Sequence, residues 1–412
     1  MPDPVKRPIA LPLLIAACAA IIAMFFSLEI YPALREPLAA NIDPDRLGDL
    51  SSNLSSGLGF VYTAHGRLVP AFDRGPLYPA LVAAMMLVSG SRSFVPVQVF
   101  QSLLHGGTCF LVFLIAGRLV SRRGAIAAQC LAGLHPMLIW YTPRVWIETT
   151  HTFLVTLTVF MLMSLEDRPA APRAAWAGAV IGITALAKSV ILPFAAVAAL
   201  GLGLRKERRL LPAAAALLGT ALLVVIPWTV RNYEAGGRLI PVHTSFGLNR
   251  VQGDAIAENW SSMPFSTLEI WSKGKASIDS ILAPSGEEPG SPAGDRILGR
   301  ASVAYSLSHP LFALWRTAVN AITFCYLSES TAKSLFLAAV EFPLMICAAL
   351  GARRLWRRGP RGRIPGLLLG YFVIVHMLIV GWARYSVPVV PVAIVLAVAL
   401  FSLPVEESPP DA

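Results

Sequence analysis

Charged residues are scarce in this chain. Asp, Glu, Lys and Arg make up only 14% of its 412 residues, whereas 55% of the residues are hydrophobic. A soluble domain has about 25% charged residues, and here several separate apolar runs are long enough to cross a hydrocarbon core of about 30 Å. This scarcity excludes a water-soluble globular protein and predicts a polytopic membrane protein.

Cysteine is also rare, and its placement argues against a zinc-binding motif. The chain has five cysteines, and no two of them have the CxxC spacing that could hold zinc. All lie inside or beside apolar runs, where a free cysteine is a small hydrophobic packing residue. They are Cys18, Cys109, Cys130, Cys325 and Cys347.

The N-terminus lacks the features of a cleavable signal peptide. Lys6 and Arg7 precede an apolar run from Ile9 to Ile30, which is too long for the apolar region of a signal peptide. No clean pattern of two small residues around a cleavage site follows it. We therefore expect this run to be the first transmembrane helix.

The surplus of positive charge is divided into short blocks between apolar runs. The formal net charge of +10 could suggest a nucleic-acid partner, but this distribution indicates membrane topology instead. Because Lys and Arg concentrate in cytoplasmic loops, we expect these blocks to be cytoplasmic. The blocks are Lys6/Arg7, Arg118/Arg122/Arg123, Arg168/Arg173, Arg205/Lys206/Arg208/Arg209 and Arg353 to Arg363.

About ten segments are predicted to cross the membrane, with a range of 10 to 12. They are Ile9–Ile30, Phe94–Val120, Ala125–Thr142, Ile147–Leu165, Ala174–Ala187, Val190–Leu204, Leu210–Val230, Leu335–Leu350, Ile364–Trp382 and Val387–Phe401. The stretch Pro76–Ser89 is short for a span. If it crossed fully, the arginines near residue 120 would face outward, so we expect a partial or interfacial helix there.

This topology leaves two long segments on the outer face, residues 31–75 and 231–330. The cytoplasmic loops are short, so we expect the chemistry on the outer face. Residues 280–295 are rich in Pro, Gly and Ser and predict a mobile linker. The next segment, "HPLFALWRTAVNAITFCYL", predicts an amphipathic helix at the outer membrane interface, interrupted by Arg316 and Asn320.

The predicted fold class is therefore an all-α polytopic membrane protein with a single helix-bundle domain over residues 1–412. Its C-terminal spans occupy residues 335–401, and a short tail, residues 402–412, follows them.

Carboxylates and basic residues gather at two places in the first outer segment. Asp43, Asp45, Arg46 and Asp49 lie within seven residues, and Asp73 with Arg74 follows later, directly before a proline-led helix. A solvated turn would explain the first group alone. Two acidic and basic groups at one membrane face favour a functional site.

Four further residues are expected near the same face. Glu148 opens a span, where the helix macrodipole would also favour an acid. Lys188 interrupts an apolar run at the outer end of two spans, although its side chain could also snorkel. Arg384 and Tyr385 enter the last span from outside. A lysine and an arginine beside several carboxylates would suit an anionic phosphate ligand.

The order of these motifs resembles bacterial members of glycosyltransferase family 39. The motifs are "DPDR", "NLSSGLGF", "FDRGPLYP", "HPMLIWYTPRVWIET", "ALAKS", "IPWTVRNYEAGGRLIPVHTSFGLNRVQGD" and "ARYSVPVVP". That family includes protein mannosyltransferases and the aminoarabinose transferase of lipid A, all with the GT-C fold. The similarity extends over roughly residues 9 to 400, and "PWTVRN…G…GLN" is its most specific part.

The resemblance implies a glycosyltransferase that takes a sugar from a polyprenyl-phosphate carrier. It would transfer the sugar to a lipid, glycan or protein acceptor on the outer face of the bacterial plasma membrane. By motif position Asp43 and Asp73 match the acidic catalytic positions, with Asp45 or Asp49 as alternatives to Asp43. The residues implied in substrate binding are Arg46, Arg74, Glu148, Lys188, Arg231, Asn249, Arg384 and Tyr385.

The chain departs from the family pattern at three places. Leu47 stands where an aromatic residue is usual, Gly75 where a second proline is common, and Lys188 where arginine is frequent.

Other functions stay open at this point. A transporter would need ionisable groups midway through the spans, and the best candidates are His105, His151 and His376. Each is more simply a hydrogen-bonded helix residue. A ligase or polymerase for lipid-linked polysaccharide and a noncatalytic scaffold are further alternatives. No cofactor is certain; a divalent metal ion stays open because carboxylates cluster, and a nucleic-acid partner is not expected.

Overall fold

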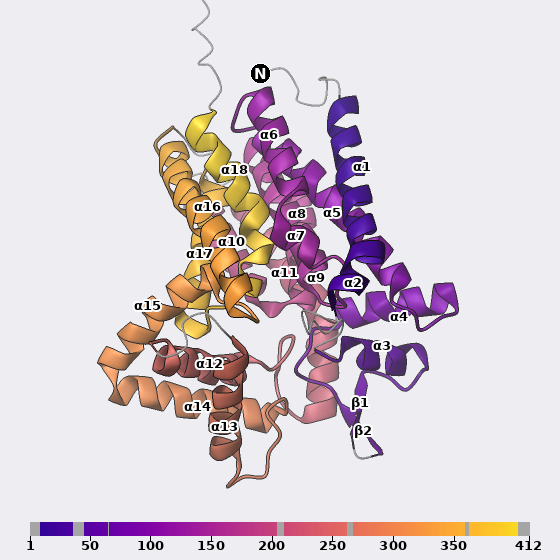
Figure 1. Ribbon diagram of the computed structural model, residues 1–412, viewed down its shortest axis with the longest axis vertical. Coiled ribbons are helices and arrows are strands. Elements are labelled where there is room, and N and C mark those ends of the chain that lie inside the picture. The colour runs from indigo at the N-terminus through magenta and orange to yellow at the C-terminus, as the bar shows by residue number, and fades with distance from the viewer. Residues whose placement is uncertain are drawn as a thin grey trace, which may run out of the picture.

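The computed structural model describes residues 9–35, 45–64, 66–203, 210–261, 267–358 and 362–402. The candidate catalytic residue Asp43 lies outside these residues. Figure 1 shows two parts: a bundle of long helices that contains both ends of the described chain at its upper end, and a smaller part below it.

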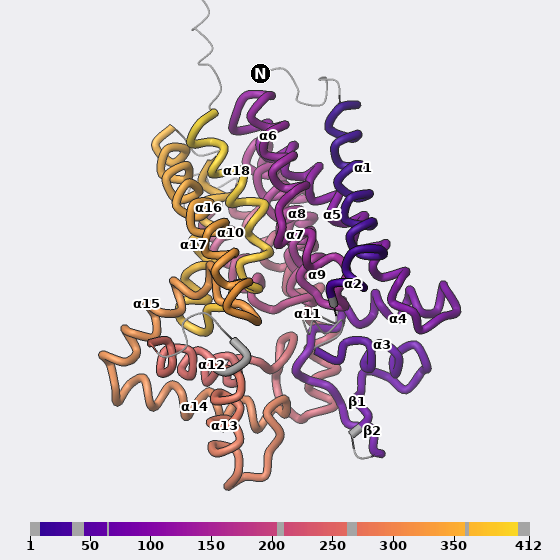
Figure 2. The backbone as a smooth tube through the Cα atoms, viewed as in Figure 1, coloured from indigo at the N-terminus to yellow at the C-terminus, as the bar shows by residue number. Residues whose placement is uncertain are grey.

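The upper part is built from helices that are mostly long and apolar. Figure 2 traces the path of the backbone through them. They are α1 (Ala10–Phe25) with a π-helical turn (Phe26–Ile30) and α2 (Tyr31–Arg35), α5 (Val95–Ala116), α6 (Arg122–Gly133), α7 (Pro136–Trp140), α8 (Glu148–Asp167), α9 (Ala171–Ala187), α10 (Leu192–Gly203), α11 (Leu211–Gly236), α16 (Thr331–Arg358), α17 (Arg363–Ile379) and α18 (Val390–Phe401).

The lower part comes from the two predicted outer segments. The first contributes α3 (Leu47–Ser55) and a hairpin of β1 (Val61–Ala64) and β2 (Arg67–Pro70), in which Val61 pairs with Pro70. The second contributes α12 (Phe246–Asn259), α13 (Thr267–Leu282), α14 (Pro292–Ser308) and α15 (Pro310–Tyr326). The all-α prediction missed this short hairpin.

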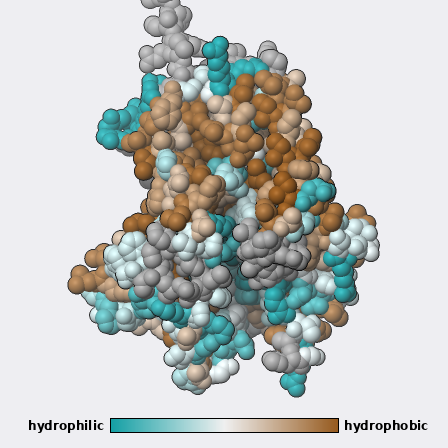
Figure 3. All heavy atoms as spheres, in the orientation of Figure 1, coloured by the Kyte–Doolittle hydropathy of each residue, from teal (hydrophilic) through white to brown (hydrophobic). Residues whose placement is uncertain are grey.

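Hydrophobic side chains cover the upper part and hydrophilic ones gather on the lower part (Figure 3). Among the described residues six helices are long and apolar enough to cross a membrane, beginning at Ala10, Val95, Glu148, Leu211, Thr331 and Ala383, and four further apolar helices are shorter. The chain is therefore a multi-pass membrane protein. The short α4 (Leu77–Ser89) lies across the direction of α1 in Figure 1, as expected for a segment that does not cross.

One predicted span is wrong as a continuous helix. Residues Ala125–Thr142 divide into α6 and α7, with Leu134 and His135 between them. Pro136 is the cause, because a proline lacks the backbone N–H that a continuous helix needs and restricts the residue before it. The break leaves α7 as a separate short helix within the bundle, below α6 in the view of Figure 1.

Polar contacts join several of the predicted cytoplasmic blocks at one end of the bundle. Arg118 forms an ion pair of 3.6 Å with Asp167, so the block near residue 120 lies beside the far end of α8. The hydroxyl oxygens of Ser121 and Ser402 lie 2.8 Å apart, so the end of α18 lies beside the same block. The blocks near residues 120 and 168 therefore lie at one end of the bundle, whereas those at residues 6–7 and 205–209 lie outside the described residues.

The predicted mobile linker is partly helical. Ser291 caps α14 by accepting a hydrogen bond from the Gly294 N–H at 2.9 Å, and Pro292 occupies the first helical turn. A Cβ atom on Gly290 would lie 3.3 Å from the Cβ of Asp73, and the Gly290 carbonyl accepts a hydrogen bond from Thr244 at 2.9 Å. The end of this segment is therefore packed against outer segment one.

The amphipathic helix predicted before the C-terminal spans is α15. Its two polar interruptions face the protein: Arg316 pairs with Asp254 of α12 at 2.9 Å, and Asn320 is fully buried. They join α15 to its neighbours, because buried charges and amides need such partners.

Candidate active site

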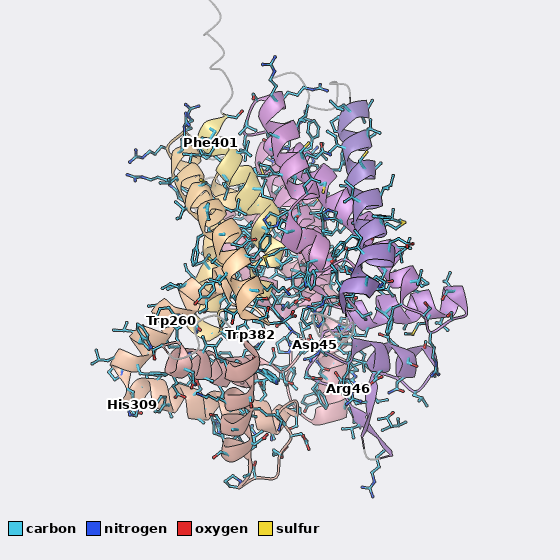
Figure 4. The ribbon with its side chains drawn as sticks, in the orientation of Figure 1. Asp45, Arg46, Trp260, His309, Trp382 and Phe401 are labelled. Carbon is cyan, nitrogen blue, oxygen red and sulfur yellow. The ribbon has the colours of Figure 1, made fainter. Side chains whose placement is uncertain are left out.

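A cavity of about 760 Å³ lies where the bundle meets the lower part. Asp45 and Trp382, both of which line it, lie at this junction in Figure 4, whereas Phe401 marks the opposite end of the bundle. The lining of the cavity contains both charged residues and apolar residues such as Met137, Trp140 and Phe336.

Six charged residues form one connected group at this cavity, which we name the six-residue cluster. It contains three cations and three carboxylates: Asp45, Asp73, Arg74, Glu148, Lys188 and Arg384. Arg74 pairs with Asp73 at 3.2 Å and with Asp45 at 3.5 Å, and Arg384 reaches Asp45 at 3.3 Å. The cluster is neutral when every member is charged.

The backbone at Arg46 directs Asp45 into the cavity. Arg46 has a φ of 54°, and it is the one non-glycine residue with positive φ in the part of the chain that the structure describes. This left-handed conformation costs about 1–2 kcal/mol for an ordinary residue. Arg46 itself points away and pairs with Asp49 at 3.0 Å, and both side chains are exposed. Figure 4 shows Arg46 below Asp45.

Gly75 explains how Asp73 and Arg74 reach the cluster. A Cβ atom on Gly75 would lie 2.4 Å from the carbonyl oxygen of Leu186 and 2.6 Å from that of Ala187. Only glycine therefore lets this loop pack against the end of α9. That contact places Gly75, the residue after Arg74, against the end of α9, which Lys188 follows directly.

Glu148 and Lys188 meet because each lies at a helix end. Glu148 is the first residue of α8 and has no exposed surface, and Lys188 caps the C-terminus of α9 in an extended conformation. The ammonium lies 3.5 Å from Glu148 Oε1, and Arg384 Nε lies 3.6 Å from the same oxygen. Among the described residues neither Glu148 oxygen has a hydrogen-bond partner.

The turn before α18 supplies Arg384 and Tyr385. Tyr385 donates a hydrogen bond to Asn249 Oδ1 of α12 at 3.2 Å, and Lys188 Nζ lies 4.4 Å from the centre of its ring. Arg384 packs against the ring of Trp146, 4.8 Å from its centre. These aromatic contacts hold both cations in place without using up their N–H donors.

The electrostatic environment keeps Asp45 ionised. Burial raises the pKa of this carboxyl, but the positive charges of Arg384, Arg74 and Lys188 lower it, and the net pKa lies below the usual value of 3.8. Asp45 is therefore a carboxylate at neutral pH, and its charge stabilises the two arginines beside it.

His243 is a cavity residue that the sequence did not single out. The backbone N–H of Ser189 donates to its Nε2 at 3.3 Å, so Nδ1 carries the proton and can donate to Ser245 Oγ at 3.1 Å. Burial and the charges of Arg74 and Lys188 lower its pKa to about 3. A neutral His243 thus holds the turn that begins at Lys188, through its hydrogen bond with Ser189. In the sequence, His243 was included only as part of the quoted motif that contains "PVHTSFGLN".

Three residues that the resemblance implied in substrate binding do not line the cavity: Glu148, which is fully buried, Arg46 and Arg231. Arg46 is exposed, as described above. Arg231 donates hydrogen bonds to the carbonyls of Ala71 at 2.9 Å and Phe60 at 2.8 Å, and it packs on Trp228. It joins outer segment one to α11. Asp49, an alternative to Asp43, also points away from the cavity.

The three histidines considered for a transporter are all buried in the bundle. His105 lies 3.2 Å from the Gly133 carbonyl, and His376 lies 2.8 Å from the Phe372 carbonyl, so both are hydrogen-bonded helix residues as expected. His151 differs, because neither ring nitrogen has a partner among the described residues.

The described residues do not fit a divalent metal ion. They contain no group of three or more His, Cys, Asp or Glu side chains arranged to hold one. Asp45 and Asp73 both pair with Arg74, which occupies the place where a cation shared by them would lie.

Residues 73–230 match the family described as dolichyl-phosphate-mannose-protein mannosyltransferase. This range includes Asp73, Arg74, Glu148 and Lys188 of the six-residue cluster. No curated protein matches the chain by sequence.

The fold is similar to that of solved glycosyltransferase structures. The Archaeoglobus fulgidus oligosaccharyltransferase in the apo form superposes with a TM-score of 0.57 and 15% identity, over 94% of this chain and 50% of that one. Its complex with an inhibitory peptide and a dolichol-phosphate gives 0.56 and 13%, over 95% and 50%. The chain thus spans about half the length of these relatives. ArnT from Cupriavidus metallidurans, bound to undecaprenyl phosphate, gives 0.43 and 14%, over 96% and 77%.

The family match covers the segment that carries most of the cluster, and the fold likeness extends over almost the whole chain. The resemblance read from the sequence is confirmed as a family match over residues 73–230 and as a likeness of fold to solved structures of the GT-C type.

Proposed function

We propose that this protein transfers a sugar from a polyprenyl-phosphate-linked donor to a hydroxyl or amine of an acceptor at the outer membrane face. The observation that carries the proposal is the six-residue cluster at a cavity where the long apolar helices meet the lower part of the molecule. A lipid-linked donor needs its tail in the bilayer and its sugar in the outer segments. A cavity at this junction satisfies both requirements.

Lys188 and Arg384 bind the donor phosphate in this proposal. Transfer breaks the bond between the sugar and the phosphate oxygen, so negative charge develops on the departing phosphate and cations stabilise it. Both cations lie about as far from Glu148 as an ion pair allows, at 3.5 and 3.6 Å. Arg384 Nη2 donates to Asp45 at 3.3 Å, but Arg384 Nε has no hydrogen-bond partner among the described residues and stays available to a phosphate oxygen.

A carboxylate of outer segment one accepts the proton of the acceptor group as the new glycosidic bond forms. Asp43 stays the prediction from the sequence. Among the described residues Asp45 and Asp73 line the cavity, whereas Asp49 does not. The low pKa of Asp45 makes it a weak base, so its pairing with two arginines suits a positioning role better.

The apolar wall of the cavity suits the lipid of the donor. Met137 and Trp140 of α7 and Phe336 and Leu337 of α16 form this wall beside the spans. The proposed location is the bacterial inner membrane, with the cavity facing outward.

Purified protein with radiolabelled polyprenyl-phosphate sugars tests this function. We expect transfer of a single sugar to an acceptor extract. Transfer of long lipid-linked polysaccharide instead would support the ligase alternative, and uptake into vesicles without transfer would support a transporter. Parallel reactions with chelator and with added divalent ions decide whether a metal is needed. Absence of turnover with every donor would refute the proposal.

A further inference from the structure

A second group of charged residues lines the cavity beside the first. Arg144, Glu329 and Lys333, here named the Arg144 cluster, come from the loop before α8, the loop after α15 and the first turn of α16. Arg144 Nη1 donates to Glu329 Oε1 at 2.6 Å, and Lys333 Nζ donates to Glu329 Oε2 at 2.8 Å. One carboxylate is thus shared by two cations.

The charge balance distinguishes the two clusters. The six-residue cluster has three cations and three carboxylates, whereas the Arg144 cluster has two cations and one carboxylate. Burial raises the pKa of Glu329, but Lys333 and Arg144 lower it to about 2, so the carboxylate is fully charged. Among the described residues the Arg144 cluster therefore keeps one uncompensated positive charge.

Arg144 is held in place but keeps a donor available. Its side chain is only 2% exposed, its Nε donates to Tyr31 at 3.2 Å, and it packs on Trp146 at 4.5 Å. Its Nη2 has no hydrogen-bond partner among the residues that the structure describes. A buried guanidinium with an unused donor beside a cavity favours an anionic ligand with oxygen acceptors.

Two neighbouring features fit an amphiphilic anion. The N-terminus of α16 begins at Thr331, and Ser330 and Ala332 line the cavity there, so the helix dipole adds positive potential. Lys333 also lies 4.5 Å from the ring of Trp140, which belongs to the apolar wall. A phosphoryl group attached to an apolar chain would satisfy both the cations and this wall.

We propose that the Arg144 cluster is a second anion subsite that binds the phosphoryl group of a phosphorylated lipid acceptor. It rests on the proposed function in one respect: Lys188 and Arg384 are assigned to the donor phosphate. The ring of Trp146 contacts both Arg144 and Arg384, so the two subsites adjoin on one wall. An acceptor bound through its phosphate would then present its reactive group to the six-residue cluster.

Calorimetric titration with dodecyl phosphate in dodecyl maltoside micelles tests this subsite without any need for transfer activity. Lys333→Gln should weaken binding roughly tenfold, because one charge-assisted contact is lost, and Lys333→Arg should retain it. Glu329→Gln should tighten binding, because it frees two cations. A purely structural role of these residues would not give opposite signs. Thermal unfolding in detergent controls for the fold of each variant.

The six-residue cluster could also bind this probe, so every titration is repeated in a Lys188→Gln background. The differences caused by Lys333→Gln and Glu329→Gln should persist there. Unchanged binding in folded Lys333→Gln and Glu329→Gln proteins would overturn the subsite.

The source of the phosphate is decided with a polyprenyl phosphate, the carrier of the proposed donor. We expect Lys188→Gln to weaken its binding and Lys333→Gln to leave it unchanged. The reverse result would assign the Arg144 cluster to the donor and overturn the acceptor proposal. If no polyprenyl-phosphate sugar is ever transferred while the dodecyl phosphate results hold, the proposed function fails and the anion subsite stands.

Discussion

The shared carboxylate of Glu148 allows a sharp test of what Lys188 and Arg384 do. Both cations lie beside the same buried oxygen, at 3.5 and 3.6 Å. Lys188→Gln alone leaves Arg384 as a partner, so the fold should hold. The double variant Lys188→Gln, Arg384→Gln leaves a buried, unpaired carboxylate, whose destabilisation is about 3–5 kcal/mol. Asp45 loses Arg384 as well but keeps Arg74.

The donor should respond differently from the fold. A hydrogen bond to a charged group contributes about 1.5–3 kcal/mol, so each single variant should weaken binding of a polyprenyl phosphate roughly 10- to 150-fold. Adding Glu148→Gln to the double variant removes the unpaired charge. This triple variant should regain thermal stability but not donor affinity.

The assay combines thermal unfolding in detergent with competition binding of the carrier lipid. Arg231→Gln is a control for donor affinity, because Arg231 lies outside the cavity. If Glu148→Gln restores donor affinity together with stability, the two cations are only counter-ions of Glu148. That result would refute the phosphate assignment.

Further predictions follow from the cavity and the topology. If Asp73 is the general base, Asp73→Asn should lower kcat roughly 10²- to 10⁴-fold without loss of donor binding. A near-normal kcat at saturating donor would exclude Asp73 and leave the base among the aspartates of the first acidic motif. The pKa of Asp45 lies below its usual value of 3.8, so Asp45 is ionised above that pH. Asp45→Asn should therefore change kcat without shifting the acidic limb of the pH–kcat profile above pH 3.8. A shift of that limb would contradict the prediction. Gly75→Ala should displace the Arg74 loop from α9 and weaken carrier binding, and a wild-type Kd would show that the loop tolerates a side chain. A cysteine at Ser285 should react with an impermeant reagent on intact cells, and one at Arg357 should not; the opposite pattern would invert the orientation.

The sequence by itself determined the class of protein and predicted the orientation of the chain in the membrane. Apolar runs and short basic blocks are local properties, because the membrane acts on each segment as a solvent and on each loop through its charge. They predicted the multi-pass bundle and the outer segments. They failed where one residue breaks a run, as Pro136 does between α6 and α7, and they missed the β1–β2 hairpin.

The sequence also supplied the members of the six-residue cluster that the structure describes, except that Asp45 was only an alternative to Asp43. It could not separate them from Arg46 and Arg231, which carry the same charge in the same motifs. The left-handed backbone at Arg46 and the carbonyls beside Arg231 turn these two side chains away from the cavity. Neither cause is visible in a motif.

Tertiary structure alone decided which charges meet. Arg384 reaches Asp45 across 339 positions, and Arg144 reaches Glu329 across 185. Gly75 lets the loop that carries Arg74 pack on α9, and Arg74 there pairs with Asp45. Ion pairing depends on distances of a few ångströms and on burial, and both arise only when the helix ends converge. The Arg144 cluster therefore became visible only in the fold.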